Sequence, residues 1–276
     1  MELDLKKVSL DAYDTGGELT LTQEETAETI VPDYCPDIAR IIETDGKVYL
    51  HSRELRDGKA ELSGTVRVTV LYTPDGESGV RTLEFAIPFT AESDGRALPG
   101  CQHLTAETET EFLEARMLNP RKIFTHCKLV THITGFQRKP LVFCADTEAE
   151  PGLQVEKRQE NQHAILLTHI AEKDFTFTEE MNLSPGREGA AELLTSQVSS
   201  TVTETKIVGS KLIFKGVFSI SLLYRDNNGG CCSAASELPF SQIMEVEGAV
   251  EGSAASLQLQ LTGTDLQIDG DDPEGR

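Results

Sequence analysis

Residues Gly46–Tyr72 read GKVYLHSRELRDGKAELSGTVRVTVLY, and residues Val198–Tyr224 repeat the pattern as VSSTVTETKIVGSKLIFKGVFSISLLY. Gly64 matches Gly216 at an offset of 152 residues (216 − 64), and the two closing tyrosines keep the same offset. In both versions, apolar and polar residues alternate over the last third, the period of a half-buried strand. The stretch therefore predicts one β-rich unit that occurs twice.

Shorter matches extend the repeat on both sides, in the same order and at nearly the same spacing. The matched pairs are LTLTQE (Leu19–Glu24) with FTFTEE (Phe175–Glu180), PDIARII (Pro36–Ile42) with REGAAELL (Arg187–Leu194), and IPF (Ile87–Phe89) with LPF (Leu238–Phe240). Self-similarity at a fixed period indicates tandem copies of one structural unit.

Turn residues divide each copy into strands. Asp57-Gly58 and Gly209-Ser210 lie between strand-like runs and predict hairpin turns, while the strand glycines Gly64 and Gly216 indicate a bulge or a close backbone approach. Pro36–Ile42 predicts a short helix that begins at a proline, with an equivalent in the second copy. The expected fold class is all-β with one short helix per repeat, arranged as two tandem antiparallel β-sandwich or barrel-like modules.

We expect a first module at residues 1–147, a linker at 148–152 and a second module at 153–276. The strand Ile123–Ile133 has no counterpart in the second copy, which stops at Arg276, opposite about Arg121. The second module is therefore expected to lack its last strand, so that the chain is a fragment or the gap is filled from elsewhere. An unfilled sheet edge is a template for association.

The composition argues against some classes of binding partner. A net charge of −21 in 276 residues opposes binding to nucleic acid and to anionic membranes. No apolar run reaches the ~18 residues that span a bilayer, and the N-terminal residues lack the apolar segment of a signal peptide. We therefore expect a cytoplasmic protein, without direct membrane insertion, whose six cysteines are reduced thiols.

The best candidate for a special site is Pro32-Asp33-Tyr34-Cys35-Pro36-Asp37. Its two prolines restrict the backbone to a rigid extended corner, which could present Tyr34 and Asp33 to a protein partner at low entropic cost. The alternative is that the corner only steers the chain into the helix, with Asp33 or Asp37 satisfying the free N–H groups of the first turn.

Other patterns predict no site. His126 and His132, like His163 and His169, are six residues apart, which on a strand is about 20 Å and too far for one metal ion. The pair Cys231-Cys232 suggests hairpin residues or cross-linking between subunits, and the acidic run from Asp265 to Glu274 lacks the spacing of a calcium loop. We expect no catalytic residue, metal or cofactor.

The string IVPDYCPDIARII (Ile30–Ile42), followed by GTVRVTVLY (Gly64–Tyr72) and IPF, resembles the SPOCS domain family of spore-coat-associated proteins in endospore-forming bacteria. The second copy resembles it through Lys215-Gly216, LLY (Leu222–Tyr224) and ELPFS (Glu237–Ser241), but has LSPGR (Leu183–Arg187) in place of the first string. The resemblance implies a non-enzymatic role in coat assembly on the mother-cell side of the forming spore, by binding a morphogenetic scaffold protein.

Three functions stay open on the sequence. The first is a spore-coat adaptor that binds a scaffold protein, with self-association through sheet edges as a further possibility. The second is a carbohydrate-binding module for cortex or cell-wall glycan, and the third is a hydrolase on a β scaffold.

Overall fold

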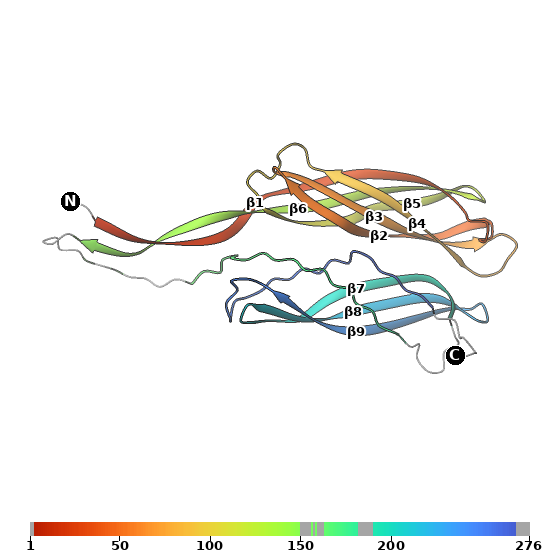
Figure 1. Cartoon of the computed structure of the whole chain (residues 1–276). Coiled ribbons are helices and arrows are strands. Elements are labelled where there is room, and N and C mark those ends of the chain that lie inside the picture. The colour runs from red at the N-terminus through yellow and green to blue at the C-terminus, as the bar shows by residue number, and fades with distance from the viewer. Residues whose placement is uncertain (1–2, 150–155, 157, 159–162, 182–189, 269–276) are drawn as a thin grey trace.

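A computed structural model describes residues 3–149, 156, 158, 163–181 and 190–268, and every named element in it is a β-strand (Figure 1). Three antiparallel three-stranded sheets form, in the orders β1-β6-β5, β2-β3-β4 and β7-β8-β9. The strands are β1 (Leu3–Ile30), β2 (Ile38–Arg56), β3 (Lys59–Pro74), β4 (Arg81–Glu92), β5 (His103–Asn119), β6 (Lys122–Ala149), β7 (Ala190–Val208), β8 (Lys211–Asp226) and β9 (Cys231–Glu245). The all-β class is confirmed.

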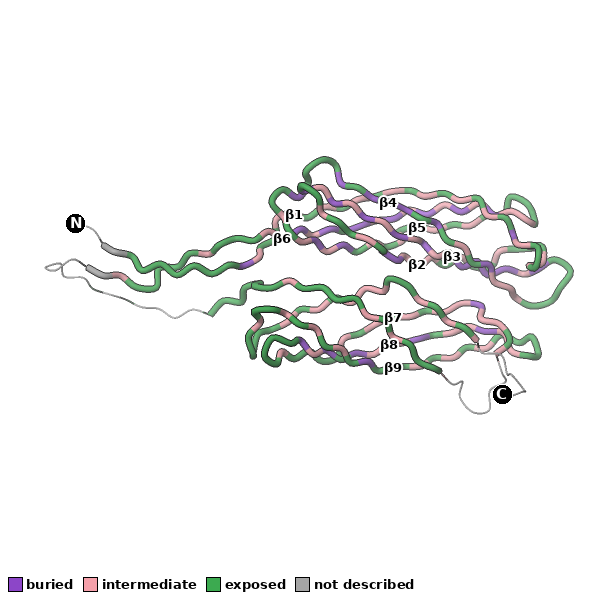
Figure 2. The backbone as a smooth tube through the Cα atoms, in the orientation of Figure 1, coloured by how far each residue is buried: buried purple, intermediate pink, exposed green. Residues whose placement is uncertain are grey.

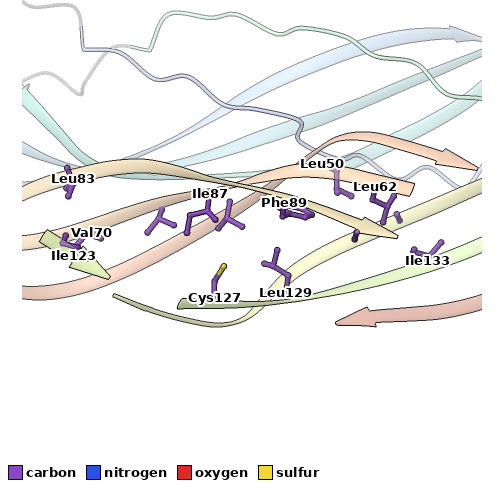
Figure 3. Close-up of a cluster of buried hydrophobic side chains, with 14 of the residues drawn as sticks. Leu50, Leu62, Val70, Leu83, Ile87, Phe89, Ile123, Cys127, Leu129 and Ile133 are labelled. Carbon is purple, nitrogen blue, oxygen red and sulfur yellow. The ribbon is translucent and has the colours of Figure 1, made fainter. Parts of the chain in front are cut away.

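The two sheets of the first half share one hydrophobic core (Figure 3). One sheet contributes Val70 from β3 and Ile87 and Phe89 from β4, and the other contributes Cys127 and Leu129 from β6. The alternation in the sequence explains this arrangement, because successive side chains of a strand point to opposite faces. Whether each half closes as a sandwich or a barrel stays a prediction.

β6 is the central strand of its sheet and is paired on both edges. Leu129, for example, lies opposite Gln23 of β1 and Thr110 of β5. Every second side chain from Ile123 to Ile133 is at most 1% exposed. β6 therefore joins the two outer strands and covers the core between them.

β1 and β6 also continue together beyond the other strands as a two-stranded ribbon, which is largely exposed (Figure 2). A register shift between Thr15 and Gly17 marks the place where the ribbon begins. Near this end the Tyr13 N–H donates a 2.6 Å hydrogen bond to the Leu167 carbonyl, which ties the ribbon to the segment 163–181.

The second half repeats the first in its irregularities as well as in its strands. β2 carries register shifts between residues 38/40, 41/43 and 50/52, and β7 carries them between residues 190/192, 193/195 and 202/204. Each pair of shifts differs by the same 152 residues (190 − 38, 193 − 41 and 202 − 50). Because bulges bend a strand at one defined residue, this agreement supports the tandem duplication independently of the sequence match.

Both strand glycines mark a close approach, as the sequence predicts. A Cβ atom on Gly64 would lie 2.5 Å from a carbonyl oxygen of β2 and 2.6 Å from Cζ of Phe89. On Gly216, it would lie 2.4 Å from a carbonyl oxygen of β7 and 2.4 Å from Cζ of Phe240. In each half, a phenylalanine of the IPF or LPF motif thus lies over a strand where only glycine leaves room.

The expected helix at Pro36–Ile42 is wrong, because residues from Ile38 onward belong to β2. The spacing of the apolar residues in this segment suggested a helix for a physical reason. Ile38 is buried and Ile41 is partly buried although they are three residues apart, since the bulge between residues 38 and 40 changes which face the next residue takes. In the second copy, residues from Ala190 onward are likewise strand, while 187–189 lie outside the described residues.

The hairpin turns are confirmed. Asp57 and Gly58 have φ angles of 51° and 81°, the left-handed pair that tight hairpins need. Of the expected linker at 148–152, two residues belong to β6 and the rest lie outside the described residues. No helix in the described part of the chain is long and apolar enough to cross a membrane.

Substituting Gly64 with alanine tests the close approach. Because neither a carbonyl oxygen nor a packed ring can move aside cheaply, we expect the free energy of unfolding to fall by about 3 kcal/mol. Gly263→Ala is the matched control, since a Cβ there would meet nothing within 4 Å. Chemical denaturation gives both values, and equal losses in the two variants would contradict the steric account.

Candidate functional site

The chain turns sharply between β1 and β2 at residues 32–37, the segment singled out in the sequence and called the corner below. Its ends are anchored, because the flanking residues Val31 and Ile38 are 0% and 1% exposed, whereas Tyr34 between them is 88% exposed. A 2.9 Å hydrogen bond from the last N–H to the first carbonyl closes the turn Pro32–Cys35. The corner thus combines buried flanking residues with an exposed aromatic tip.

Arg121, in the turn between β5 and β6, holds the corner through its guanidinium group. It donates hydrogen bonds of 2.8 Å to the carbonyls of Val31 and Cys35. It also forms ion pairs of 3.2 Å with Asp33 and 3.1 Å with Asp37. The planar fork of arginine suits several fixed acceptors at once, so one side chain ties both ends of the turn to the body of the first half.

Backbone hydrogen bonds reinforce this anchor. The Val31 N–H donates to the Arg121 carbonyl and the Ile38 N–H donates to the Pro120 carbonyl, each at 2.9 Å. On the other side, the Asp75 N–H donates to the Asp37 carbonyl at 2.8 Å. The corner is therefore held between the β5–β6 turn and the end of β3, and its tip is free to contact another molecule.

The structure excludes the helix-capping interpretation of the aspartates, whereas partner binding by the corner stays a prediction. Asp33 and Asp37 do not cap a helix, because the chain continues as strand and both carboxylates pair with Arg121. Sequence reasoning missed this arginine, which is 84 to 90 residues away from its acceptors along the chain. The available signal was the composition of the segment, because two carboxylates and two prolines need hydrogen-bond donors from elsewhere in the chain. That signal does not identify the donor, since any of the 25 lysine and arginine residues could have supplied it.

Tyr72 supports the corner from the core side. Its side chain is fully buried, and its hydroxyl donates a 3.3 Å hydrogen bond to the Pro36 carbonyl. Burial, with a smaller effect of the nearby Cys35 thiol, raises the pKa of Tyr72 to about 12. The hydroxyl therefore remains protonated, and a donor, over the whole ordinary pH range.

The matching tyrosine of the second copy, Tyr224, is also buried, at 1% exposure. Its hydroxyl has no hydrogen-bond partner among the described residues. The second copy's equivalent of the corner, Leu183–Arg187, lies outside the described residues. The partner-binding candidate therefore rests on the first copy alone.

A hollow of about 560 Å³ opens beside the corner, between the two halves of the chain. Its volume is in the range of pockets that enclose a small ligand or a few side chains. The wall is mixed, with an aromatic tip and groups of both charges. The lining includes Tyr34, Pro36 and Tyr72 on the corner side, Arg81 and Glu84 of β4, Glu192 and Leu193 of β7, and Leu266.

The remaining sequence candidates do not converge on a second site. On the outer face of β6, His126 bonds Glu24 at 3.2 Å and His132 bonds Thr20 at 3.1 Å. Across the described ranges, no group of three or more His, Cys, Asp or Glu side chains lies close enough together to hold a metal ion.

The other candidates lie apart from the corner. His163 and His169 belong to the segment 163–181, outside the named strands. Cys231 and Cys232 open β9, and neither forms a disulfide with another described cysteine. In the acidic run, only Asp265 is described, because the acidic residues from Asp269 onward lie outside the described residues.

Comparison with known proteins agrees with the repeat. A family model described as "SipL, SPOCS domain" matches residues 37–118 and again residues 189–269. Of the corner, only Asp37 lies within a matched region. No curated protein and no solved structure matches the chain. The two matches cover more than half of the chain and confirm the resemblance and the two tandem copies.

Replacing Arg121 with alanine tests the anchor. We expect the free energy of unfolding to fall by about 2 kcal/mol, because partly buried carbonyls lose a charged donor, and amide exchange at residues 31–37 to accelerate. Arg138→Ala is the control, since Arg138 makes one exposed ion pair, with Asp11. Exchange at the corner that is as slow in Arg121→Ala as in the control would contradict the anchoring role.

The raised pKa of Tyr72 predicts a pH dependence of stability. Since the pKa is higher in the folded state, its contribution is complete below pH 10 and is lost as the pH rises toward 12. A pKa that is higher by about 2 in the folded state corresponds to about 2.7 kcal/mol in the free energy of unfolding. Denaturation of wild type and Tyr72→Phe at several alkaline pH values checks this, because the wild type should lose stability faster; parallel decreases would contradict it.

Proposed function

The chain belongs to the SipL SPOCS domain family, and from this premise we propose that it is a non-enzymatic adaptor of endospore coat assembly that binds a coat scaffold protein. The family description supports a protein-interaction role connected with sporulation. The proposed place of action is the mother-cell side of the forming spore, and the proposed partner is the coat's morphogenetic scaffold.

The observation that carries this proposal is the exposure of Tyr34 on a rigid support. Tyrosine is one of the residues that contribute most to protein–protein binding, because it offers a large apolar ring and a hydroxyl at low entropic cost. Here the ring is 88% exposed, while Arg121 and the backbone bonds hold both ends of its turn. A partner would bind Tyr34 without first having to order the loop.

The surroundings of Tyr34 define the partner's side of the contact. The adjacent hollow is wide enough for a side chain of the partner, and Leu193 and Leu266 give it an apolar wall. Within the hollow, Glu192 is paired with Arg225. The net charge of −21 favours a basic patch on the partner, since complementary potentials accelerate association.

The electrostatics at the corner fit a structural role for Tyr72 better than a catalytic one. Tyr72 has the largest pKa displacement, and it moves away from neutral pH and serves a buried hydrogen bond. Catalytic acids and bases are tuned toward the working pH. The perturbed group near the corner is therefore better explained as a structural support than as a catalyst.

Direct binding to the purified coat scaffold of the same organism tests the proposal. We expect the wild-type chain to bind and the double variant Asp33→Ala/Tyr34→Ala to bind about 30-fold more weakly, as for loss of an interface hot spot of about 2 kcal/mol. Biolayer interferometry gives both dissociation constants.

Val250→Ala is the matched control, because Val250 is also an exposed apolar residue, at 68%, and lies in the second half. Its affinity should equal that of the wild type. Absence of wild-type binding would contradict the adaptor role, whereas equal binding by the double variant would contradict only the corner as the contact.

A further inference from the structure

The two halves differ around one strand. In the first half, β6 lies between β1 and β5 and is hydrogen-bonded to both. In the second half, the sheet β7-β8-β9 matches β2-β3-β4, but the described residues contain no second ladder. The counterparts of β1 and β5 are nevertheless present, as the segments 171–181 and 254–268.

The burial pattern identifies these two segments as flanking strands. Phe175 and Phe177 are partly buried and their neighbours are exposed, the alternation of a strand with one face on a core. In the segment 254–268, every second residue from Ala255 to Leu261 is partly buried, matching the alternation from Leu104 to Thr110 in β5 at an offset of 151 (255 − 104).

Both segments pack on the core of the second half. The rings of Phe177 and Phe218 have centroids 5.0 Å apart, and those of Phe175 and Phe240 are 5.9 Å apart. Leu257, Leu259 and Leu261 approach the same cluster from the other segment. The first-half side chains Tyr49 and Arg53 contact Thr264 and Gln260, which helps to place the segment 254–268 between the halves (Figure 1).

Among the described residues, these segments have no partner for their backbones. Neither 171–181 nor 254–268 has a backbone–backbone hydrogen bond to another described residue. The core beneath them is also less completely covered. Val66 and Val68 of β3 are 0% exposed, whereas their counterparts Phe218 and Ile220 of β8 are 8% and 9% exposed.

We propose that the segments 171–181 and 254–268 are the outer strands of a sheet whose central strand is donated by a partner protein. The donated strand would occupy the position of β6, antiparallel to both neighbours. It would satisfy two rows of backbone groups and complete the core of the second half, the physical basis of strand addition. This inference deepens the proposed adaptor role and rests on it.

β6 shows what chemistry such a strand needs. Its inward residues are apolar or small, and polar side chains on its outward face meet carboxylates on the neighbouring strands. Lys128 bonds Glu111 of β5 at 2.6 Å and His126 bonds Glu24 of β1 at 3.2 Å. The donated strand should therefore have apolar or small residues on its inward face and at least one basic residue on its outward face, over about the length of Ile123–Ile133.

Charge favours a partner over a second copy of this chain. The outward residues of the segment 171–181 include Asp174 and Glu180, both exposed, and Glu172, which forms a 3.1 Å ion pair with Arg53 of β2. A second copy would bring another 21 net negative charges to this surface, and its own β6 is already paired on both edges. A basic strand of a different protein meets neither obstacle.

The experiment uses the whole chain and a synthetic peptide of residues 122–134, KIFTHCKLVTHIT, with Cys127→Ser to prevent oxidation. We expect saturable binding by fluorescence anisotropy. Hydrogen exchange at 171–181 and 254–268 should slow by about tenfold when free peptide is at ten times its Kd. Exchange in the sheet β1-β6-β5 should stay unchanged.

Two altered peptides make the test specific without risk to the fold of the protein. Leu129→Asp places a charge toward the core and should abolish binding, while Lys122→Glu/Lys128→Glu should weaken it at least tenfold. Equal binding by all three peptides, or protection outside the two segments, would overturn the proposal.

The other occupants give distinct results. If the amides of both segments exchange slowly in the protein alone, the position between the two segments (the slot) is already filled and the proposal is overturned. A dimeric mass by light scattering then assigns the central strand to a second copy. A monomeric mass assigns it to the chain itself. Loss of peptide binding with intact scaffold binding would reject the slot and keep the adaptor role. Peptide binding without scaffold binding would keep the slot and reject the adaptor role.

Discussion

In each half, a phenylalanine ring lies over a glycine in the middle strand of a sheet. At Gly64 and Gly216 the ring of Phe89 or Phe240 and a carbonyl oxygen of the neighbouring strand both lie where a side chain would have to stand. This contact sets how β3 and β4, or β8 and β9, lie against each other, and it directs the ring into the core. The three bulges of β2 recur in β7 at the same offset as the glycines. The duplication is thus a property of the packing as well as of the sequence.

The sequence was sufficient wherever the cause of the structure was local. The alternation in Val66–Tyr72 predicted a strand, and Asp57-Gly58 predicted a hairpin, because strand period and left-handed turn residues act within a few positions. The helix at Pro36–Ile42 was wrong because the bulge after Ile38 gives an apolar spacing that resembles a helical face. Arg121 was missed because the chain brings it to the corner only through the complete β1-β6-β5 sheet.

The candidate site also has one part that the sequence predicts and one part that only the structure shows. The prolines indicated a rigid segment at residues 32–37, and the structure places Tyr34 at its exposed tip. The support beneath it, Arg121 and Tyr72, comes from two other strand ends and is visible only in three dimensions. The unpaired segments of the second half likewise required the first half as a template, since their sequences alone resemble ordinary strands.

The proposed corner contact and the proposed strand slot would use the duplicated unit in two ways. The first copy has its central strand in place and presents a finished surface. The second copy shares the Gly–Phe contact, so it folds around the same middle strand, yet its flanking segments remain without a ladder among the described residues. Proton NMR tests the shared architecture most directly. The account predicts NOEs from the Hα protons of both Gly64 and Gly216 to the rings of Phe89 and Phe240, respectively. An NOE in the first pair without one in the second would contradict the claim that both halves are copies of one folded unit.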